Sequence, residues 1–146
     1  MKSIFDKSTR DELKSRIQHL NEQSTPLWGK MNVGQMMRHC TKWDEMAMEK
    51  TKYKQSFMGK LFGKMALKQI MQDAPMKKNV PTVPSFRIKE TINVAEEKAK
   101  WLRLMDEYDH CTGEGYLHPF FGKLTKDQTG RMAYKHADHH LKQFNV

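Results

Sequence analysis

The chain has 146 residues, of which 38% are hydrophobic and 29% are charged, a composition typical of one soluble globular domain spanning residues 1–146. It contains no apolar run near the ~20 residues that a membrane span needs and no secretory signal, so we expect a cytoplasmic protein without a membrane partner. The formal net charge of +9 is compatible with nucleic acid as a partner.

A first helix is expected to begin at the capping-box pattern formed by Thr9 and Glu12. Apolar residues then follow at helical spacing as far as Asn21: Leu13, Ile17 and Leu20. A second helix is expected after Asn32, with Gln35 in the reciprocal capping position. Its apolar residues gather on one broad face at about 100° per residue: Val33, Met36, Met37, Cys40, Trp43, Met46 and Ala47.

Residues 57–72 also have a helical pattern, weakened by Gly59 and Gly63, each of which costs roughly 1 kcal/mol relative to alanine. Three prolines in the following segment, residues 73–90, predict a long extended crossover. Because Cys40 and Cys111 are the only cysteines and form no CxxC pair, disulfides are not expected to organise the fold.

A fourth helix is predicted to start after Asn93, with one apolar face: Val94, Trp101, Leu102, Met105 and Tyr108. Glycines and a proline make residues 111–124 irregular, and Thr125 with Gln128 then caps a last helix. Four principal amphipathic helices, one long crossover and one additional short helix predict an all-α four-helix bundle, an architecture that builds metal sites from side chains on facing helices.

Histidines on two of the predicted apolar faces suggest such a site. On the last helix, His136 and His140 fall inside the apolar stripe one turn apart, close enough to bind one ion, while His139 falls at its edge. On the second helix, His39 lies between Trp43 and Met46 and points inward. Three imidazoles plus an open position are typical of a catalytic zinc-type site, although imidazole also suits nickel, copper and iron.

Other interpretations of these histidines remain open. A single histidine on an apolar face is more often a hydrogen-bonded core residue, but three buried histidines without partners would leave several polar groups unsatisfied. Two other metal sites are disfavoured, because Ala137 occupies the place of the glutamate in the zincin HExxH pattern, and only Glu107 with His110 fits the ExxH pattern of di-iron bundles. His118, in a loop before proline, is a further candidate for lining the site.

The segments "LWGKMNVGQMMRHCTKW" and "HPFFGKLTKDQTGRMAYKHADHHLKQF" resemble the DinB/YfiT-like metalloenzyme superfamily, and most closely a subgroup described as a domain of unknown function. The most specific matches are His39 with Trp43, and the terminal HxxHH. The resemblance implies a four-helix bundle that forms homodimers and binds a divalent metal, zinc or nickel, through His39, His136 and His140. His139 in place of His140 is the alternative ligand.

Characterised members of that superfamily include metal-dependent transferases that use a low-molecular-weight thiol, and others are described as hydrolases. The first functional hypothesis is therefore a thiol S-transferase or hydrolase acting on a small-molecule substrate, with His118, His139 and Trp43 near the metal or substrate. The second is a basic helical binding module without catalytic activity that contacts nucleic acid or protein. Salt-dependent nucleic-acid binding would favour the second hypothesis.

Overall fold

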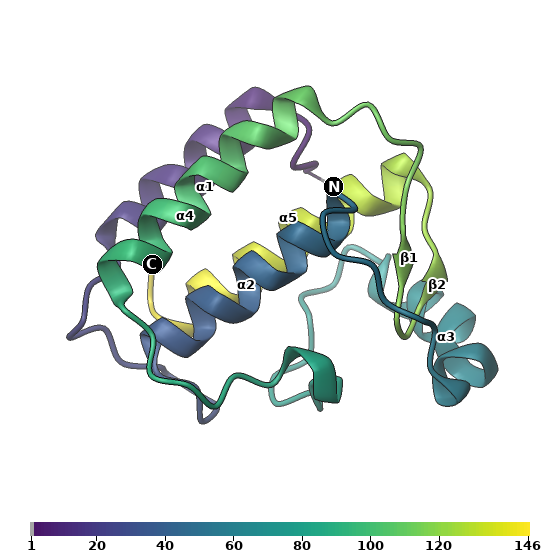
Figure 1. The fold of residues 1–146 in the computed structure, drawn as a ribbon, viewed down its shortest axis with the longest axis horizontal. Coiled ribbons are helices and arrows are strands. Elements are labelled where there is room, and N and C mark those ends of the chain that lie inside the picture. Colours follow the sequence, from purple (N-terminus) through teal and green to yellow (C-terminus); the bar gives the residue numbers. More distant parts are fainter. Residues whose placement is uncertain (1) are drawn as a thin grey trace.

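The structure, a computed structural model, describes residues 2–146 and is mostly helical (Figure 1). Within these residues lie five α-helices: α1 (Lys7–His19), α2 (Val33–Ala47), α3 (Phe57–Ile70), α4 (Val94–Glu107) and α5 (Lys126–Gln143). Two short 3-10 helices, η1 (Pro84–Phe86) and η2 (Tyr108–His110), and two strands, β1 (Leu117–His118) and β2 (Gly122–Lys123), complete the described elements. In this part of the chain, no helix has the length and apolar character needed to cross a bilayer.

Four of the helices enclose the hydrophobic core. Helix α4 packs against both α1 and α2, and α5 packs against the same two helices from the other side (Figure 1). The predicted apolar faces of α2 and α5 point into this core, which also receives residues of α1 and α4. Fully buried members come from all four helices: Leu13, Met36, Met37, Trp101, Met105 and Leu141.

Local capping explains where most helices begin. The capping boxes predicted at Asn32 and Thr125 are both present, and the side chain of Asn93 accepts a hydrogen bond from the backbone N–H of Glu96. The predicted start of the first helix at Thr9 is wrong. Helix α1 begins two residues earlier, after Asp6, and Thr9 lies buried within its first turn.

The buried face of α4 is wider than the apolar spacing predicted. Leu104 is buried, whereas Leu102 is only partly buried. The reason is that α4 contacts two helices, so side chains on two of its sides are covered. Its buried Glu97 accepts a hydrogen bond from the Thr41 hydroxyl of α2, and Arg38 lies 3.5 Å from the same carboxylate.

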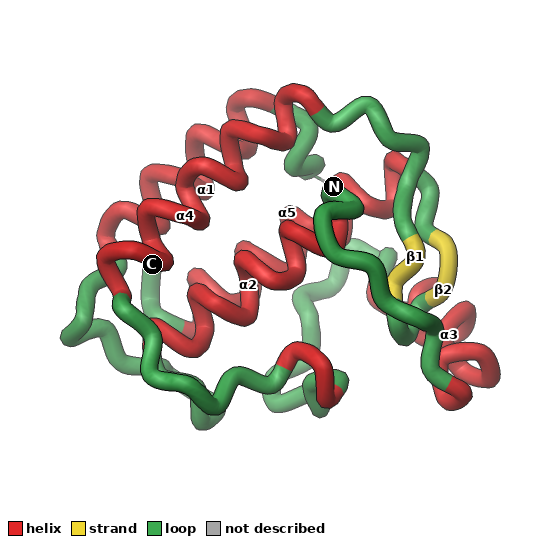
Figure 2. Tube along the Cα trace, in the orientation of Figure 1, coloured by secondary structure: helices red, strands yellow, loops and turns green. Residues whose placement is uncertain are grey.

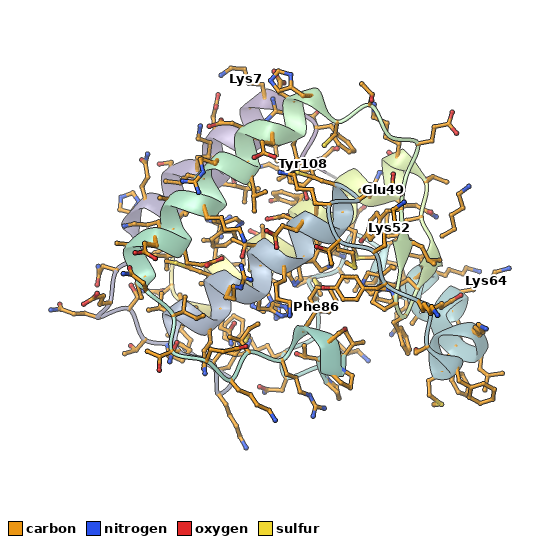
Figure 3. All side chains as sticks on the ribbon, in the orientation of Figure 1. Lys7, Glu49, Lys52, Lys64, Phe86 and Tyr108 are labelled. Atoms are coloured by element: carbon orange, nitrogen blue, oxygen red, sulfur yellow. The ribbon has the colours of Figure 1, made fainter. Side chains whose placement is uncertain are left out.

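The predicted long crossover is present between α3 and α4. Residues 73–93 contain no α-helix and only the short η1 turn, and Figure 2 shows this segment as loop apart from that turn. Within this segment, η1 packs against α2. It thereby brings Phe86, a buried aromatic residue, against the middle of α2 (Figure 3).

A small hairpin occupies the segment predicted to be irregular. Strands β1 and β2 pair antiparallel, with His118 opposite Gly122. Helix α3 packs on the turn of this hairpin through Gly59 and Gly63, where a Cβ atom would lie only 2.5 Å and 2.1 Å from the carbonyl oxygen of Phe120. The glycines that weaken α3 as an isolated helix therefore permit its close approach to the hairpin.

Candidate metal centre

Two facing helices position the three histidines that the sequence selected. His39 lies in the middle of α2, and His136 and His140 lie one turn apart on α5, which packs against α2. The three side chains belong to buried residues with only 6–8% of their surface exposed. The i, i+4 spacing on α5 turns both of its imidazoles towards α2.

The three rings form a compact cluster. Their centroids are 4.7–4.9 Å apart in each pair. One ring nitrogen from each residue lies within 4.8 Å of the others, and Nε2 of His39 is 2.9 Å from Nε2 of His136. Three nitrogen atoms on three side chains thus converge on one point inside the helical core.

Hydrogen bonds to the far side of two rings fix their orientation. Nδ1 of His39 lies 3.2 Å from the carbonyl oxygen of Phe86, and Nδ1 of His140 lies 2.8 Å from the side-chain oxygen of Gln143. Because these oxygens can only accept, each Nδ1 carries the proton and each Nε2 keeps its lone pair. Gln143 is itself oriented, since its amide N–H donates to the carbonyl of Trp28 at 2.7 Å.

Burial keeps the three imidazoles neutral. Loss of hydration lowers the pKa of His39 and His136 below the usual value, and it lowers the pKa of His140 to about 3. The neighbouring histidines act in the same direction on His136 and His140, because two positive charges so close together repel. The neutral imidazole is the form that binds a metal ion.

The cluster therefore fits a divalent transition metal. Zinc–nitrogen bonds of about 2.0–2.1 Å at tetrahedral angles place two ligand nitrogens about 3.3 Å apart. The 2.9 Å between Nε2 of His39 and Nε2 of His136 is a few tenths of an ångström shorter, whereas the candidate nitrogens of the three rings spread over up to 4.8 Å. The rings would therefore have to turn to bring all three separations to about 3.3 Å around an ion. Three protein nitrogens leave a fourth tetrahedral position open.

Trp43 and His139 flank this cluster without belonging to it. The indole of Trp43, one turn after His39, stacks on the His136 ring at 5.1 Å between centroids. His139 is partly buried, with its ring 5.2 Å from that of His140 and 5.5 Å from that of Trp28. The cluster of three convergent ring nitrogens contains His140. Among the described residues, His139 is not part of any such group of three potential metal ligands.

His118 has a different environment. Its Nδ1 accepts hydrogen bonds from the backbone N–H groups of Phe120 and Phe121, at 3.0 Å and 3.1 Å, and so closes the turn of the hairpin. Burial lowers the pKa of His118 to about 3. Its ring touches Tyr116, which in turn packs edge-on against Trp43. Tyr116 and Trp43 thus connect His118 to the His136 ring, and the charge of His118 is one of the influences that lower the pKa of His136.

Asp44 is a buried carboxyl group that the sequence analysis overlooked. It lies one residue after Trp43 on α2, and its oxygens accept hydrogen bonds from Nε1 of Trp101 at 3.0 Å and the hydroxyl of Tyr108 at 2.7 Å. Burial raises its pKa to about 7, although the two hydrogen bonds act in the opposite direction. The nearby hydroxyl of Tyr116 is buried without a hydrogen-bond partner among the described residues.

The hydrogen-bond acceptors of His140 and His39 were not predicted from the sequence either. Gln143 follows His140 by three residues, so helical spacing alone could have placed it beside that ring. The carbonyl of Phe86 comes from the crossover, and no local pattern indicates which backbone oxygen reaches α2.

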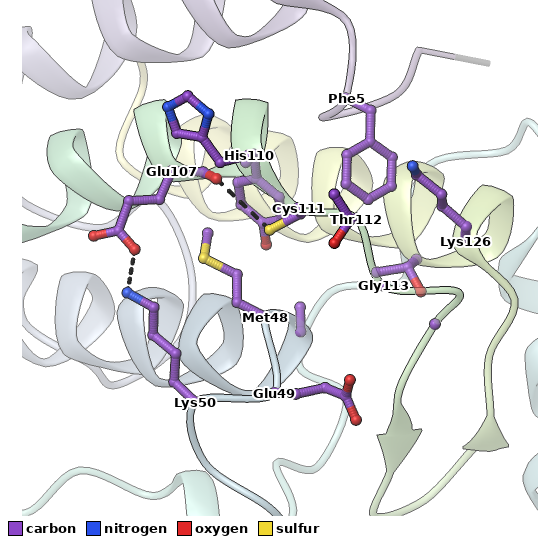
Figure 4. Close-up of a pocket in the computed structure, with 14 residues that line it drawn as sticks. Phe5, Met48, Glu49, Lys50, Glu107, His110, Cys111, Thr112, Gly113 and Lys126 are labelled. Atoms are coloured by element: carbon purple, nitrogen blue, oxygen red, sulfur yellow. Dashed lines mark hydrogen bonds and ion pairs between the residues drawn. The ribbon is translucent and has the colours of Figure 1, made fainter.

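A cavity of about 560 Å³ lies apart from the histidine cluster, where the end of α2 meets η2 and the start of α5 (Figure 4). Its walls include Lys50, which pairs with Glu107, and Cys111, whose thiol donates to the Glu107 carbonyl at 3.6 Å. Partial burial raises the pKa of the Cys111 thiol, so the thiol lacks the lowered pKa of an activated nucleophile. Chemistry is thus favoured at the histidine cluster.

Comparison with protein families identifies the chain as a member of the family described as "Protein of unknown function (DUF1569)", whose model matches residues 5–146. This match confirms the expected domain of unknown function. No curated protein and no solved structure matched the chain.

Proposed function

We propose that this member of the DUF1569 family is a DinB-like metalloenzyme, with a divalent metal, zinc or nickel, held by His39, His136 and His140. The observation that carries the proposal is the convergence of three neutral imidazoles from two packed helices within 4.8 Å, two of them with Nδ1 bonded to a carbonyl oxygen. Metal-ligating histidines commonly donate their second N–H group to such an acceptor.

The helical arrangement supports the superfamily assignment. Helices α1, α2, α4 and α5 pack in a closed ring, and a long crossover connects α3 to α4. This arrangement suits a four-helix bundle whose metal ligands come from facing helices. We propose the homodimer on the resemblance alone, and sedimentation velocity of the purified protein tests it.

The chemistry follows from the donor set. A divalent metal with three histidine ligands and an open position lowers the pKa of a water or thiol towards neutrality, which supplies a nucleophile without a protein base. Phe86 and Gln143 hold two rings in the correct tautomer, and Trp43 covers the face of a third. The proposed reaction is transfer of a low-molecular-weight thiol to an electrophile, or hydrolysis, on a small substrate.

Electrostatics favour an anionic substrate. The chain carries 26 lysine and arginine residues against 17 aspartate and glutamate residues, so its overall field attracts negative molecules. Lys78 stands 4.2 Å above the ring of Trp28, whose carbonyl orients Gln143. A positive charge thus lies on the side of the cluster formed by Trp28 and His139.

The test begins with metal content. Untagged protein, purified without chelator and analysed by plasma mass spectrometry, should carry near one equivalent of a transition metal, and His136→Ala should lose it. His19→Ala, at an exposed position outside the cluster, is the matched control and should retain the metal. A parent protein that neither carries zinc or nickel nor takes them up on titration would overturn the metal centre.

A second assay separates catalysis from mere binding. The metal-loaded parent is screened for consumption of thiols with small electrophiles and for ester and amide hydrolysis, beside His39→Ala at equal folded concentration. Turnover in the parent that His39→Ala loses supports an enzyme. Metal binding without any turnover across these panels would contradict the catalytic proposal while leaving the metal site intact.

A further inference from the structure

Helix α3 exposes large apolar side chains that would be buried in an ordinary surface helix. Five of its residues are 44–74% exposed: Phe57, Met58, Leu61, Phe62 and Met65. At 100° per residue they occupy a continuous stripe of roughly 140°. Contiguous exposed apolar surface on a folded protein commonly marks an interaction site.

The rest of the fold holds this stripe in place. The opposite side of α3 packs on the hairpin through Gly59 and Gly63. At the C-terminal end of the helix, the ammonium group of Lys135 on α5 donates to the carbonyls of Ile70, Gln72 and Ala74, at 2.6–2.8 Å. The helix is therefore anchored on its polar and glycine-bearing side while the apolar side faces outward.

The charge around the stripe has one sign. Residues 51–72 contain five lysines and no aspartate or glutamate: Lys52, Lys54, Lys60, Lys64 and Lys68. Lys60, Lys64 and Lys68 are exposed and follow one another along one edge of the stripe. Figure 3 shows Lys64 pointing away from the body of the protein.

We propose that α3 docks the protein onto the surface of an anionic lipid bilayer. A basic amphipathic helix lies in the bilayer interface with its apolar side chains among the acyl chains and its lysines beside anionic head groups. Antiparallel pairing with α3 of a second copy would place both rows of lysines on the same side of the pair. The hairpin behind α3 blocks a protein groove that wraps around the helix. Docking at the surface requires no spanning helix, and none is found among the described residues. The proposal is independent of the metal centre.

Vesicle flotation tests this docking. The full chain is mixed with vesicles of phosphatidylcholine alone or of phosphatidylcholine with phosphatidylglycerol, and floats only with the anionic vesicles if the proposal holds. The double variant Leu61→Ser, Met65→Ser should stay in the unbound fraction. Both positions are exposed, so its circular dichroism should match the parent.

Lysine variants test the electrostatic part. Replacing Lys60, Lys64 and Lys68 by glutamine should weaken partitioning by about fivefold per residue, on the order of a hundredfold in total. A matched variant loses the same charge at exposed positions outside α3, and its loss should be several-fold smaller: Lys7→Gln, Lys30→Gln and Lys89→Gln.

Three results would overturn the proposal. The first is a parent that does not bind anionic vesicles, and the second is a Leu61→Ser, Met65→Ser variant that binds as tightly as the parent. Equal losses in the two lysine variants would indicate non-specific attraction. If the parent stays unbound and sediments as a dimer that the serine variant dissociates, the stripe is a contact between copies of the chain. If the parent binds duplex DNA and does not bind vesicles, the lysines form a nucleic-acid-binding surface.

Discussion

Gln143 links His140 to Trp28: its side-chain oxygen accepts from Nδ1 of His140 at 2.8 Å, and its amide nitrogen donates to the Trp28 carbonyl at 2.7 Å. The second hydrogen bond determines which way the amide points. The first then sets the tautomer of His140, so that Nε2 is free to bind a metal. Gln143 is thus a positioning residue for the proposed metal centre.

Gln143→Leu should therefore weaken zinc binding by about ten- to a hundredfold, because the His140 ring loses its orienting acceptor. Competition with a chromophoric chelator measures the affinity. Gln143→Glu keeps an acceptor at this position and should bind within several-fold of the parent, whereas Gln69→Leu, on the exposed side of α3, should not differ from it. Equal zinc affinity in Gln143→Leu and the parent would contradict the positioning role.

The metal-free protein should lose stability on acidification. Burial lowers the pKa of five histidines: His39, His118, His136, His139 and His140. The unfolded chain takes up protons at these rings near pH 6.5 while the folded chain takes up fewer, so the free energy of unfolding falls as the pH drops below about 6.5. Urea unfolding between about pH 7 and pH 5 measures the slope, and constant stability over this range would refute the prediction.

Asp44 should oppose this trend. Its pKa of about 7 lies above the unfolded value of about 3.9, so the folded state holds an additional proton between these values, and the contribution of Asp44 to stability declines as the pH rises through this window. Asp44→Asn removes that contribution. The variant should therefore lose stability more steeply on acidification, by up to about 1.4 kcal/mol per pH unit. A slope equal to that of the parent would mean that Asp44 is ionised throughout.

Gly63→Ala should destabilise the fold by about 1–3 kcal/mol, even though alanine favours an isolated helix by about 1 kcal/mol. The added Cβ would lie 2.1 Å from the carbonyl oxygen of Phe120, so α3 would have to separate from the hairpin. Gly113→Ala is the control, because its Cβ meets only a Glu49 carboxylate oxygen at 3.8 Å. Thermal unfolding compares the two variants, and an equal or higher midpoint for Gly63→Ala would show that α3 does not require this approach.

Tyr116→Phe should leave stability unchanged or raise it by up to about 1 kcal/mol, because the lost hydroxyl is buried without a partner. Tyr108→Phe is its matched counterpart. There the lost hydroxyl donates to Asp44 at 2.7 Å, and the variant should lose about 1–3 kcal/mol. Denaturant unfolding distinguishes the pair, and a comparable loss in both variants would mean that Tyr116 has a hydrogen-bond partner in solution.

Local sequence signals predicted much of the helical framework and the proposed ligands. Asn32 and Thr125 begin their helices as expected, because a capping box involves only four consecutive residues. The apolar stripes of α2 and α5 placed His39, His136 and His140 on the inward faces of these helices. Because α2 and α5 pack against each other, the three side chains meet.

Features that depend on distant segments were not predictable in this way. The contact of the Phe86 carbonyl with His39 joins residues 47 positions apart, and Leu104 is buried only because α4 meets two helices. The exposure of Phe57 and Met65 was likewise hidden, since a helical pattern rich in apolar residues suggests burial until the neighbours of the helix are known.

Cobalt(II) titration of the metal-free protein, followed by visible absorption, tests the three-histidine centre most directly, because the ligand-field bands report ligand number and geometry. Saturation is expected at one cobalt per chain, with intense bands of a four-coordinate site that are lost in His39→Ala and retained in His19→Ala. Weak bands like those of aqueous cobalt in the parent, or a spectrum unaffected by His39→Ala, would contradict the three-histidine centre.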